Sequence, residues 1–436
     1  MTDLSAQKDE ANRLRKDKQL DEALPIYRML WEKSGDKYDG CGLLHCLRNL
    51  KILDEAIILA DELIVRYPDF NWCRIEVIWT YIQGKLLALG EKESLGKVKE
   101  VADQITSLNP DTLALKTVVF TVIKHAKSSN NWQIVNEWIV KLDPNALDSN
   151  PPNDSLKKQE WSDQERWYNY RISGLLEKWD SREQLEKALQ LTDEALSHFT
   201  EHKKFFLRLK ALGYHKLGDL SEAKKQYQSL CSGHNTDWWL LHEYANVVKD
   251  MGVAPEALAL MCKAALSQAP LKAKVTLIRD IGMLCKDMGN NEAARAHLIL
   301  AKQVREEQGW SIPEVITATI SSLNRILGDE KSLSMRESLK LCQNEWLKFS
   351  PKENSWSQTR RAKRNGLMGN VSLGRAENAF AFIVTKDEQV FCFKSDLPND
   401  VKDGDKVTFD AIPSFDNKKN KESWKASNIQ PVENSA

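Results

Sequence analysis

Three hexapeptides share one pattern: GDLSEA at residues 218–223, GVAPEA at 252–257 and GNNEAA at 289–294. In each, a glycine stands five positions before an alanine, and the alanines are 34 and 37 residues apart. A second small residue stands twelve positions before each alanine, at Ala211, Ala245 and Gly282. A pattern that recurs at a period of about 34 residues predicts a chain built from one repeated supersecondary unit.

Each unit is typical of a pair of helices. Apolar or small residues follow each alanine at four and seven positions, as Tyr227 and Leu230 follow Ala223. This spacing places them on one face of a helix. The glycine ends the first helix, and a polar residue before the glutamate starts the second. One such hairpin cannot bury its own apolar face, so we expect successive hairpins to stack.

These spacings resemble tetratricopeptide repeats, best over residues 205–305. Looser units centre on Ala23 and Ala56, and the prolines of SLNP (107–110) and KLDP (141–144) suggest two degenerate ones. The resemblance implies an all-α solenoid with a concave surface that holds a segment of a protein partner. Self-association through the same surface is a further possibility.

The helical region is predicted to fall into two parts. Residues 1–145 form a first block of repeats, and residues 163–350 form a second. The intervening 146–162 is a loop, because the sequence there is rich in Pro, Asn, Asp and Ser. It either separates two blocks or interrupts one solenoid. Two helices, at about 313–327 and 332–349, are expected to cap the array.

The composition changes after residue 350. Residues 351–365 are polar and basic and are predicted to form a linker. Short β-type runs with Gly, Asn and Asp turns follow in residues 366–436, which predicts a small antiparallel barrel. In NAFAFIV (378–384), alternation places Phe380 and Phe382 on one face of a strand and Ile383 on the other. The fold class is therefore multidomain, an α-solenoid followed by an all-β barrel.

The order and spacing of these runs resemble a cold-shock domain, an OB-fold barrel that binds nucleic acids. NAFAFI (378–383) falls on the first ribonucleoprotein motif, K-G-F-G-F-I, and VFCF (390–393) falls on the second, V-F-V-H. The chain differs from the family at the motif lysine, at both motif glycines, at the tryptophan of the opening strand and at an aromatic after the second motif. The residues at these positions are Asn378, Ala379, Ala381, Leu373 and Lys394.

The resemblance implies that four phenyl rings form an outward surface on which bases stack, each base contributing about 1–3 kcal/mol. Residues 366–436 hold nine Lys and Arg against eleven Asp and Glu, so phosphate attraction would depend on the linker and on local lysines. The predicted nucleic-acid-binding residues are Phe380, Phe382, Phe391, Phe393, Lys394, Arg360, Arg361, Lys363 and Arg364. The alternatives are that the rings pack against another part of the chain and that the basic run is a solvated linker.

No catalytic, cofactor or metal site is predicted. His198 and His202 stand one helical turn apart, but a third ligand is missing, so surface histidines are favoured over zinc. The chain carries no P-loop, G-x-S-x-G or Rossmann motif. Its eight scattered cysteines form no C-x-x-C pair, which predicts free thiols and a cytoplasmic location. No apolar run approaches the roughly 20 residues of a membrane helix, and a signal peptide is not expected at the polar N-terminus.

The sequence therefore predicts a non-catalytic adaptor. Its helical repeats bind a protein partner, and its barrel binds single-stranded RNA or DNA. One alternative is a protein–protein scaffold with a degenerate barrel. The other is a regulatory subunit of a nucleic-acid-processing, stress or defence enzyme.

Overall fold

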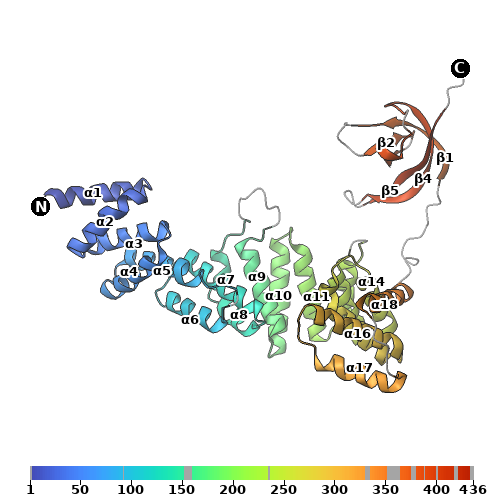
Figure 1. The fold of residues 1–436 in the computed structure, drawn as a ribbon, viewed down its shortest axis with the longest axis horizontal. Coiled ribbons are helices and arrows are strands. Elements are labelled where there is room, and N and C mark those ends of the chain that lie inside the picture. The colour runs from blue at the N-terminus through green and yellow to red at the C-terminus, as the bar shows by residue number, and fades with distance from the viewer. Residues whose placement is uncertain are drawn as a thin grey trace. The chain divides into compact units, whose positions relative to one another are not determined.

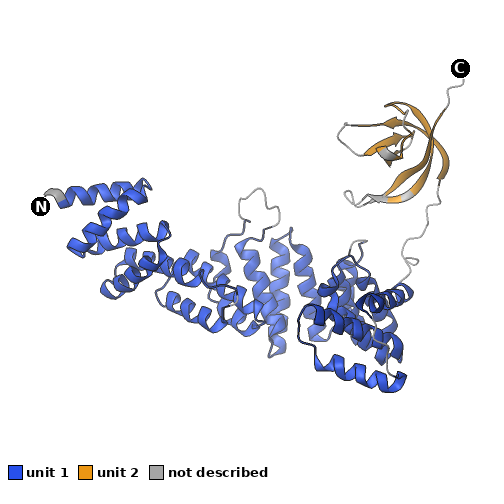
Figure 2. Ribbon diagram, viewed as in Figure 1, with its two compact units in different colours: residues 1–350 blue, residues 351–436 orange. Residues whose placement is uncertain are grey.

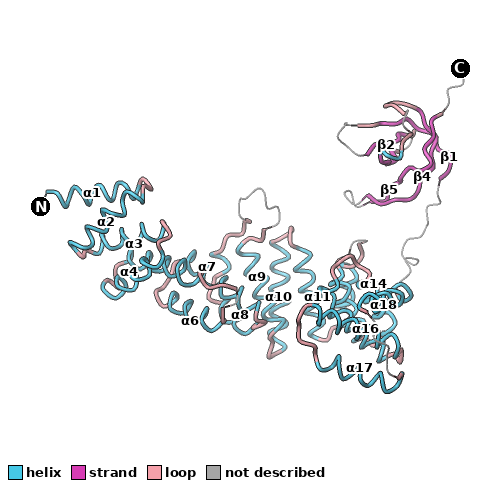
Figure 3. Tube along the Cα trace, viewed as in Figure 1, coloured by secondary structure: helices cyan, strands magenta, loops and turns pink. Residues whose placement is uncertain are grey.

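The computed structural model describes residues 2–91, 93–151, 160–233, 236–328, 334–350, 364–374, 380–386, 388–398, 401–416 and 421–432. The chain divides into two compact units, residues 1–350 and 351–436 (Figure 2). Within the described residues, α-helices occur in the first unit and strands in the second (Figure 3). The predicted fold class, a helical-repeat array followed by a small barrel, is confirmed.

The first unit is an array of α-helices in which successive helices pack on one another (Figure 1). Within its described residues the α-helices are α1 (Thr2–Lys16), α2 (Leu20–Ser34), α3 (Lys37–Asn49), α4 (Leu53–Arg66), α5 (Asn71–Tyr81), α6 (Leu95–Thr106), α7 (Thr112–Ser128), α8 (Trp132–Ile139), α9 (Asp163–Glu177), α10 (Arg182–His198), α11 (Lys203–Leu217), α12 (Leu220–Leu230), α13 (Trp238–Asp250), α14 (Ala254–Ala265), α15 (Val275–Asp287), α16 (Asn291–Glu307), α17 (Glu314–Leu327) and α18 (Met335–Phe349). A π-helical turn, Ile82–Leu86, extends α5.

The repeat signals have the structural roles that the pattern predicts. Gly218, Gly252 and Gly289 adopt left-handed backbone conformations, with φ near +80°, directly after α11, α13 and α15. Only glycine takes this conformation without strain. The small residues lie where paired helices touch. A Cβ atom on Gly282 would lie 2.9 Å from Cγ of Leu298 and 3.2 Å from the carbonyl oxygen of Ala294.

The helices on either side of the predicted loop at 146–162 pack directly against each other. The indole Nε1 of Trp167 in α9 donates a hydrogen bond to the carbonyl oxygen of Ile139 at the end of α8, at 3.0 Å. One cluster of buried apolar side chains extends from Ala11 to Leu209 and includes residues before and after this loop. A second cluster extends from Ala211 to Trp346.

The two predicted capping helices correspond to α17 and α18. Helix α18 packs against α14 and α16. Its Trp346 is 2% exposed, and the indole Nε1 donates a hydrogen bond to Nε2 of His297 in α16, at 2.8 Å. Burial of this large side chain at the end of the array covers apolar surface that a terminal repeat would otherwise expose.

The second unit is a closed five-stranded barrel in the order β1-β2-β3-β5-β4. Its strands are β1 (Arg364–Ser372), β2 (Phe380–Val384), β3 (Gln389–Phe393), β4 (Lys406–Asp416) and β5 (Lys421–Pro431). The pairs are antiparallel except β3 with β5, which is parallel. Strand β1 begins inside the segment predicted as linker, because Arg364 pairs with Ala411 of the long β4.

Candidate nucleic-acid interface

The candidate interface is the outer face of β2 and β3. Along both strands, burial alternates residue by residue. Ala381, Ile383, Val390 and Cys392 point into the barrel core, where each is at most 1% exposed. Burial raises the pKa of the Cys392 thiol to about 11, so this side chain stays neutral in the core. The alternation predicted for these strands is confirmed.

The four phenylalanines share the opposite, outer face. In the β2–β3 register, Phe380 stands opposite Phe393 and Phe382 opposite Phe391. Neighbouring ring centroids are 5.1–6.2 Å apart, and three of the four contacts are edge-to-face. Aromatic pairs favour this geometry. We call this group, Phe380, Phe382, Phe391 and Phe393, the phenylalanine cluster.

The cluster has two exposed and two half-buried members. Phe380 is 37% exposed and Phe393 is 43% exposed. Phe382 and Phe391, which form the other cross-strand pair, are half-buried between their neighbours. The two exposed rings therefore form the accessible part of the surface, and the other two support them from the side.

Lys425 of β5 adds a positive charge that the sequence prediction missed. Its Nζ lies 4.7 Å from the ring centroid of Phe393, and its main chain is aligned with Phe391 through the parallel β3–β5 pairing. The ammonium also lies 3.4 Å from a carboxylate oxygen of Asp396. A cation over an aromatic face is attracted by the ring. The alternation of KASNI (425–429) predicts that Lys425 points outward. Only the pairing of β5 with β3, which are distant in sequence, shows that it lies beside Phe393.

The predicted cations are not all placed beside the rings. Arg364 pairs with the carboxylate of Glu388, and its guanidinium carbon lies 4.3 Å from the ring centroid of Trp424. Lys394 begins a short 3-10 turn directly after β3 and is half-buried. The remaining predicted cations, Arg360, Arg361 and Lys363, lie outside the described residues.

Two of the differences from the cold-shock motifs have a clear structural setting. Ala381 fills a core position of β2 opposite Cys392. Leu373, where the family carries a tryptophan, packs against the barrel core. Asn378 and Ala379 lie outside the described residues. Among the described residues, the aromatic rings of this interface are therefore the four phenylalanines of β2 and β3, and β1 contributes none.

The paired histidines of the helical array are not both at the surface as predicted. His198 is exposed, but His202 is buried. Its Nδ1 lies 2.9 Å from Oε1 of Glu165, and its ring stacks on Trp161 with centroids 4.4 Å apart. His202 is covered by Glu165 of α9 and by Trp161, which precedes α9. Both residues are distant from His202 in the sequence, so the sequence around His202 does not reveal its burial. The arrangement joins α9 to the start of α11.

The described residues show neither a metal-binding cluster nor a membrane-spanning helix. No group of three or more His, Cys, Asp or Glu side chains there is placed to hold a metal ion. No helix in this part of the chain is long and apolar enough to cross a membrane.

Comparison with known proteins gives limited similarity. A family described as a domain of unknown function (DUF7017) matches residues 205–325. No curated protein matches the chain.

Solved structures align to most of the chain at low similarity. A tetratricopeptide repeat protein from Parabacteroides merdae has 15% identity, covers 74% of this chain and 99% of its own, and gives a TM-score of 0.28. Human IFIT1 dimers align over 79% of this chain. The dimer with m7Gppp-AAAA has 15% identity, 77% coverage of its own chain and a TM-score of 0.36. The dimer with PPP-AAAA has 12% identity, 83% coverage and a TM-score of 0.33. Likeness at this level does not indicate what the present chain binds.

Proposed function

We propose that this chain is a non-catalytic cytoplasmic adaptor whose helical repeats bind a protein partner and whose barrel is a cold-shock-like module for single-stranded RNA or DNA. The observation that carries the nucleic-acid part is the phenylalanine cluster on the outside of a closed barrel. The parallel β3–β5 closure and the position of the rings on two adjacent strands support the family resemblance. The eight free cysteines support a reducing compartment.

The cluster suits unpaired bases for a physical reason. An exposed phenyl ring offers a flat apolar face, and every base has a π-face that can stack on it with little sequence preference. In a duplex the base faces are already stacked on each other. A strand can reach these rings only where its bases are unpaired, so the proposed ligand is single-stranded.

Among the described residues, few cations lie beside the rings, so we expect phosphate contacts to contribute less than stacking to the affinity there. Lys425 is beside Phe393 but is shared with Asp396. Lys394 and the basic run that ends at Arg364 are proposed to attract further phosphates of the strand. Stacking therefore supplies the main part of the affinity, and the cations orient the strand.

The experiment compares strands with duplexes on the full chain. A fluorescently labelled strand of about ten nucleotides, within the usual length for one OB fold, is titrated with protein at low salt as RNA and as DNA. Unlabelled single strand should displace it at much lower concentration than the blunt duplex of the same sequence. If neither strand binds, the barrel is instead a protein-binding part of a scaffold. If the duplex competes equally, stacking is not the mode of binding.

A further inference from the structure

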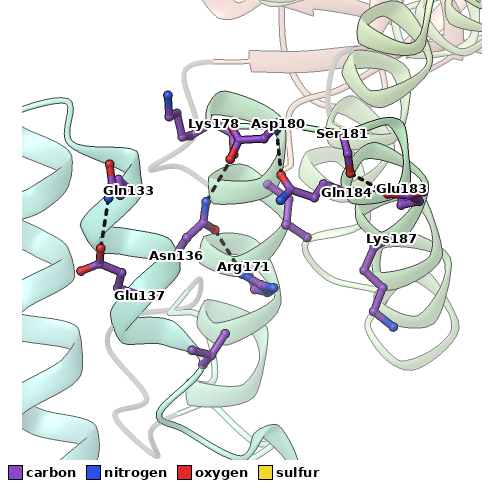
Figure 4. A pocket seen from close by; sticks show the side chains of 12 residues that line it. Gln133, Asn136, Glu137, Arg171, Lys178, Asp180, Ser181, Glu183, Gln184 and Lys187 are labelled. Carbon is purple, nitrogen blue, oxygen red and sulfur yellow. Dashed lines mark hydrogen bonds between the residues drawn. The ribbon is translucent and has the colours of Figure 1, made fainter.

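An open groove lies in the helical array between α8, α9 and the start of α10 (Figure 4). Its volume is about 870 Å³, within the size range of ligand sites in proteins. Cations and acids line it in equal number: Arg171, Lys178, Lys187, Glu137, Asp180 and Glu183. The net charge of the lining is therefore close to zero, but its cations have fewer charged partners than its acids.

The guanidinium of Arg171 is held in place by a neutral partner. Its NH1 donates a hydrogen bond to Oδ1 of Asn136, at 3.2 Å. The amide of Asn136 is fixed in turn by donating to the carbonyl oxygen of Gly174, at 2.9 Å. A Cβ atom on Gly174 would lie 2.4 Å from Oδ1 of Asn136, so only glycine leaves room for this contact. A dashed line in Figure 4 joins Asn136 to Arg171.

Three other partly buried arginines of the array, Arg48, Arg208 and Arg279, are bonded to carboxylates. Arg48 donates to Glu76 at 2.8 Å, Arg279 lies 2.7 Å from Asp280, and Arg208 pairs with Glu243. For Arg208, burial opposes the charge, but the bond to Glu243 outweighs it and raises the pKa.

Arg171 differs from these arginines. Burial lowers its pKa, and no carboxylate of the described residues lies within ion-pair distance of its guanidinium. A half-buried guanidinium without a counter-ion has lost part of its hydration and gained no opposite charge.

The other two cations of the groove likewise have no carboxylate partner among the described residues. Lys187 donates to the amide oxygen of Gln190, and no described carboxylate lies within ion-pair distance of Lys178. Among the acids, Glu137 has a cation at the limit of ion-pair distance, Nζ of Lys99 at 4.0 Å. Glu137 accepts a hydrogen bond from Gln133, and Glu183 accepts one from the hydroxyl of Ser181.

We propose that this groove binds an extended peptide segment of the protein partner, with a carboxylate of an aspartate or glutamate side chain on Arg171. The inference rests on the proposed adaptor function. A carboxylate matches the fork of guanidinium N–H groups and restores the missing charge. Three acids in the lining disfavour a polyanion such as nucleic acid. The volume of the groove, about 870 Å³, and its mixed charges suit several residues of a peptide better than one small carboxylate.

The test follows arginine Nε–H signals by NMR in the full chain labelled with 15N at arginine Nε. The Arg171 signal is assigned by its loss in Arg171→Lys, whose unfolding temperature is compared with that of the wild type. The probes are two pools of capped pentapeptides, with glutamate or glutamine at the centre and random flanks, and sodium acetate at the same millimolar concentration. Arg28, an exposed arginine paired with Glu55, is the internal control.

The glutamate pool should shift the Arg171 signal in a saturable way, and the glutamine pool should not. An unmoved signal, or equal shifts with both pools, would overturn the proposal. A shift that acetate reproduces at the same concentration would overturn the peptide part, because the site would then take any small carboxylate. The proposed binding of oligonucleotides does not involve Arg171. If the peptides do not bind but a single strand does, the groove proposal is rejected and the nucleic-acid part of the proposed function is kept.

Discussion

At the scale of single residues, the size of one side chain decides what its neighbours can do. Ala381 lies where the cold-shock motif has glycine, yet it is 1% exposed and sits in the core between outward-facing Phe380 and Phe382. Because the extra methyl group is accommodated inside the barrel, it does not displace the rings outside. The motif difference therefore leaves the phenylalanine cluster intact.

His297 links stability to pH. Its Nδ1 donates to the carbonyl oxygen of Ala293 and its Nε2 accepts from Trp346, at 2.7 Å and 2.8 Å, so the buried ring is neutral. Burial lowers the pKa of His297 to about 4, from 6.5 in an unfolded chain. The unfolded state binds the proton first as pH falls, so we predict a loss of about 2 kcal/mol in unfolding free energy from about pH 7.5 to pH 5.

The measurement is urea unfolding at both pH values for the wild type and for His297→Gln. Glutamine keeps an acceptor for Trp346 but does not titrate. The variant should lose distinctly less stability on acidification than the wild type. An identical pH dependence in both proteins would show that His297 is not the residue responsible.

At the scale of helices, close approach depends on small residues at particular positions. A Cβ atom on Gly42 in α3 would lie 2.2 Å from Cε1 of the buried Tyr27 in α2, whereas one on Gly96 in α6 would meet nothing within 4 Å. We predict that Gly42→Ala destabilises the chain by about 1–3 kcal/mol through overpacking. Gly96→Ala should stabilise it by up to about 1 kcal/mol through helix propensity.

Thermal unfolding followed by circular dichroism compares the two substitutions. They are chemically identical and both lie in helices, so intrinsic propensity favours alanine in each. Opposite shifts of the unfolding temperature are expected. Shifts in the same direction would mean that the contact with Tyr27 relaxes at little cost.

The sequence predicts elements well where the signal is local. Gly218, its equivalents and the alanines after them indicate the helical hairpins, and strand alternation indicates the outward face of Phe380. Features that depend on distant contacts are missed. Lys425 joins the phenylalanine cluster only through the parallel β3–β5 pairing, and His202 is buried because Trp161 and Glu165 cover it. The groove at Arg171 likewise requires three helices in place.

At the scale of the whole molecule, the net charge is zero and residues 366–436 carry two more acids than bases. We therefore expect that any non-specific attraction of nucleic acid depends on the basic run before the barrel. We predict that Arg360→Gln, Arg361→Gln and Lys363→Gln together weaken strand binding at low salt. They should also reduce the slope of log affinity against log salt by about 2, because each lost phosphate contact removes about 0.7 from the slope.

The measurement is a salt titration of strand binding by the full chain and by the triple variant. The two proteins should converge in affinity at high salt, where stacking is the main contribution. Parallel plots with the same slope would identify the run as a solvated linker.

Binding of unpaired bases by the exposed rings of the barrel can be tested with Phe380→Leu combined with Phe393→Leu in the full chain. Leucine keeps the apolar surface but removes the flat ring, and Met368→Ala, an exposed apolar site on β1, is the matched control. We predict at least about a tenfold loss of affinity for a single strand in the double variant, from two stacked bases at about 1–3 kcal/mol each. Met368→Ala should keep wild-type affinity, and both variants should keep the wild-type unfolding temperature. Unchanged affinity in the double variant, or an equal loss in Met368→Ala, would show that bases do not stack on these rings.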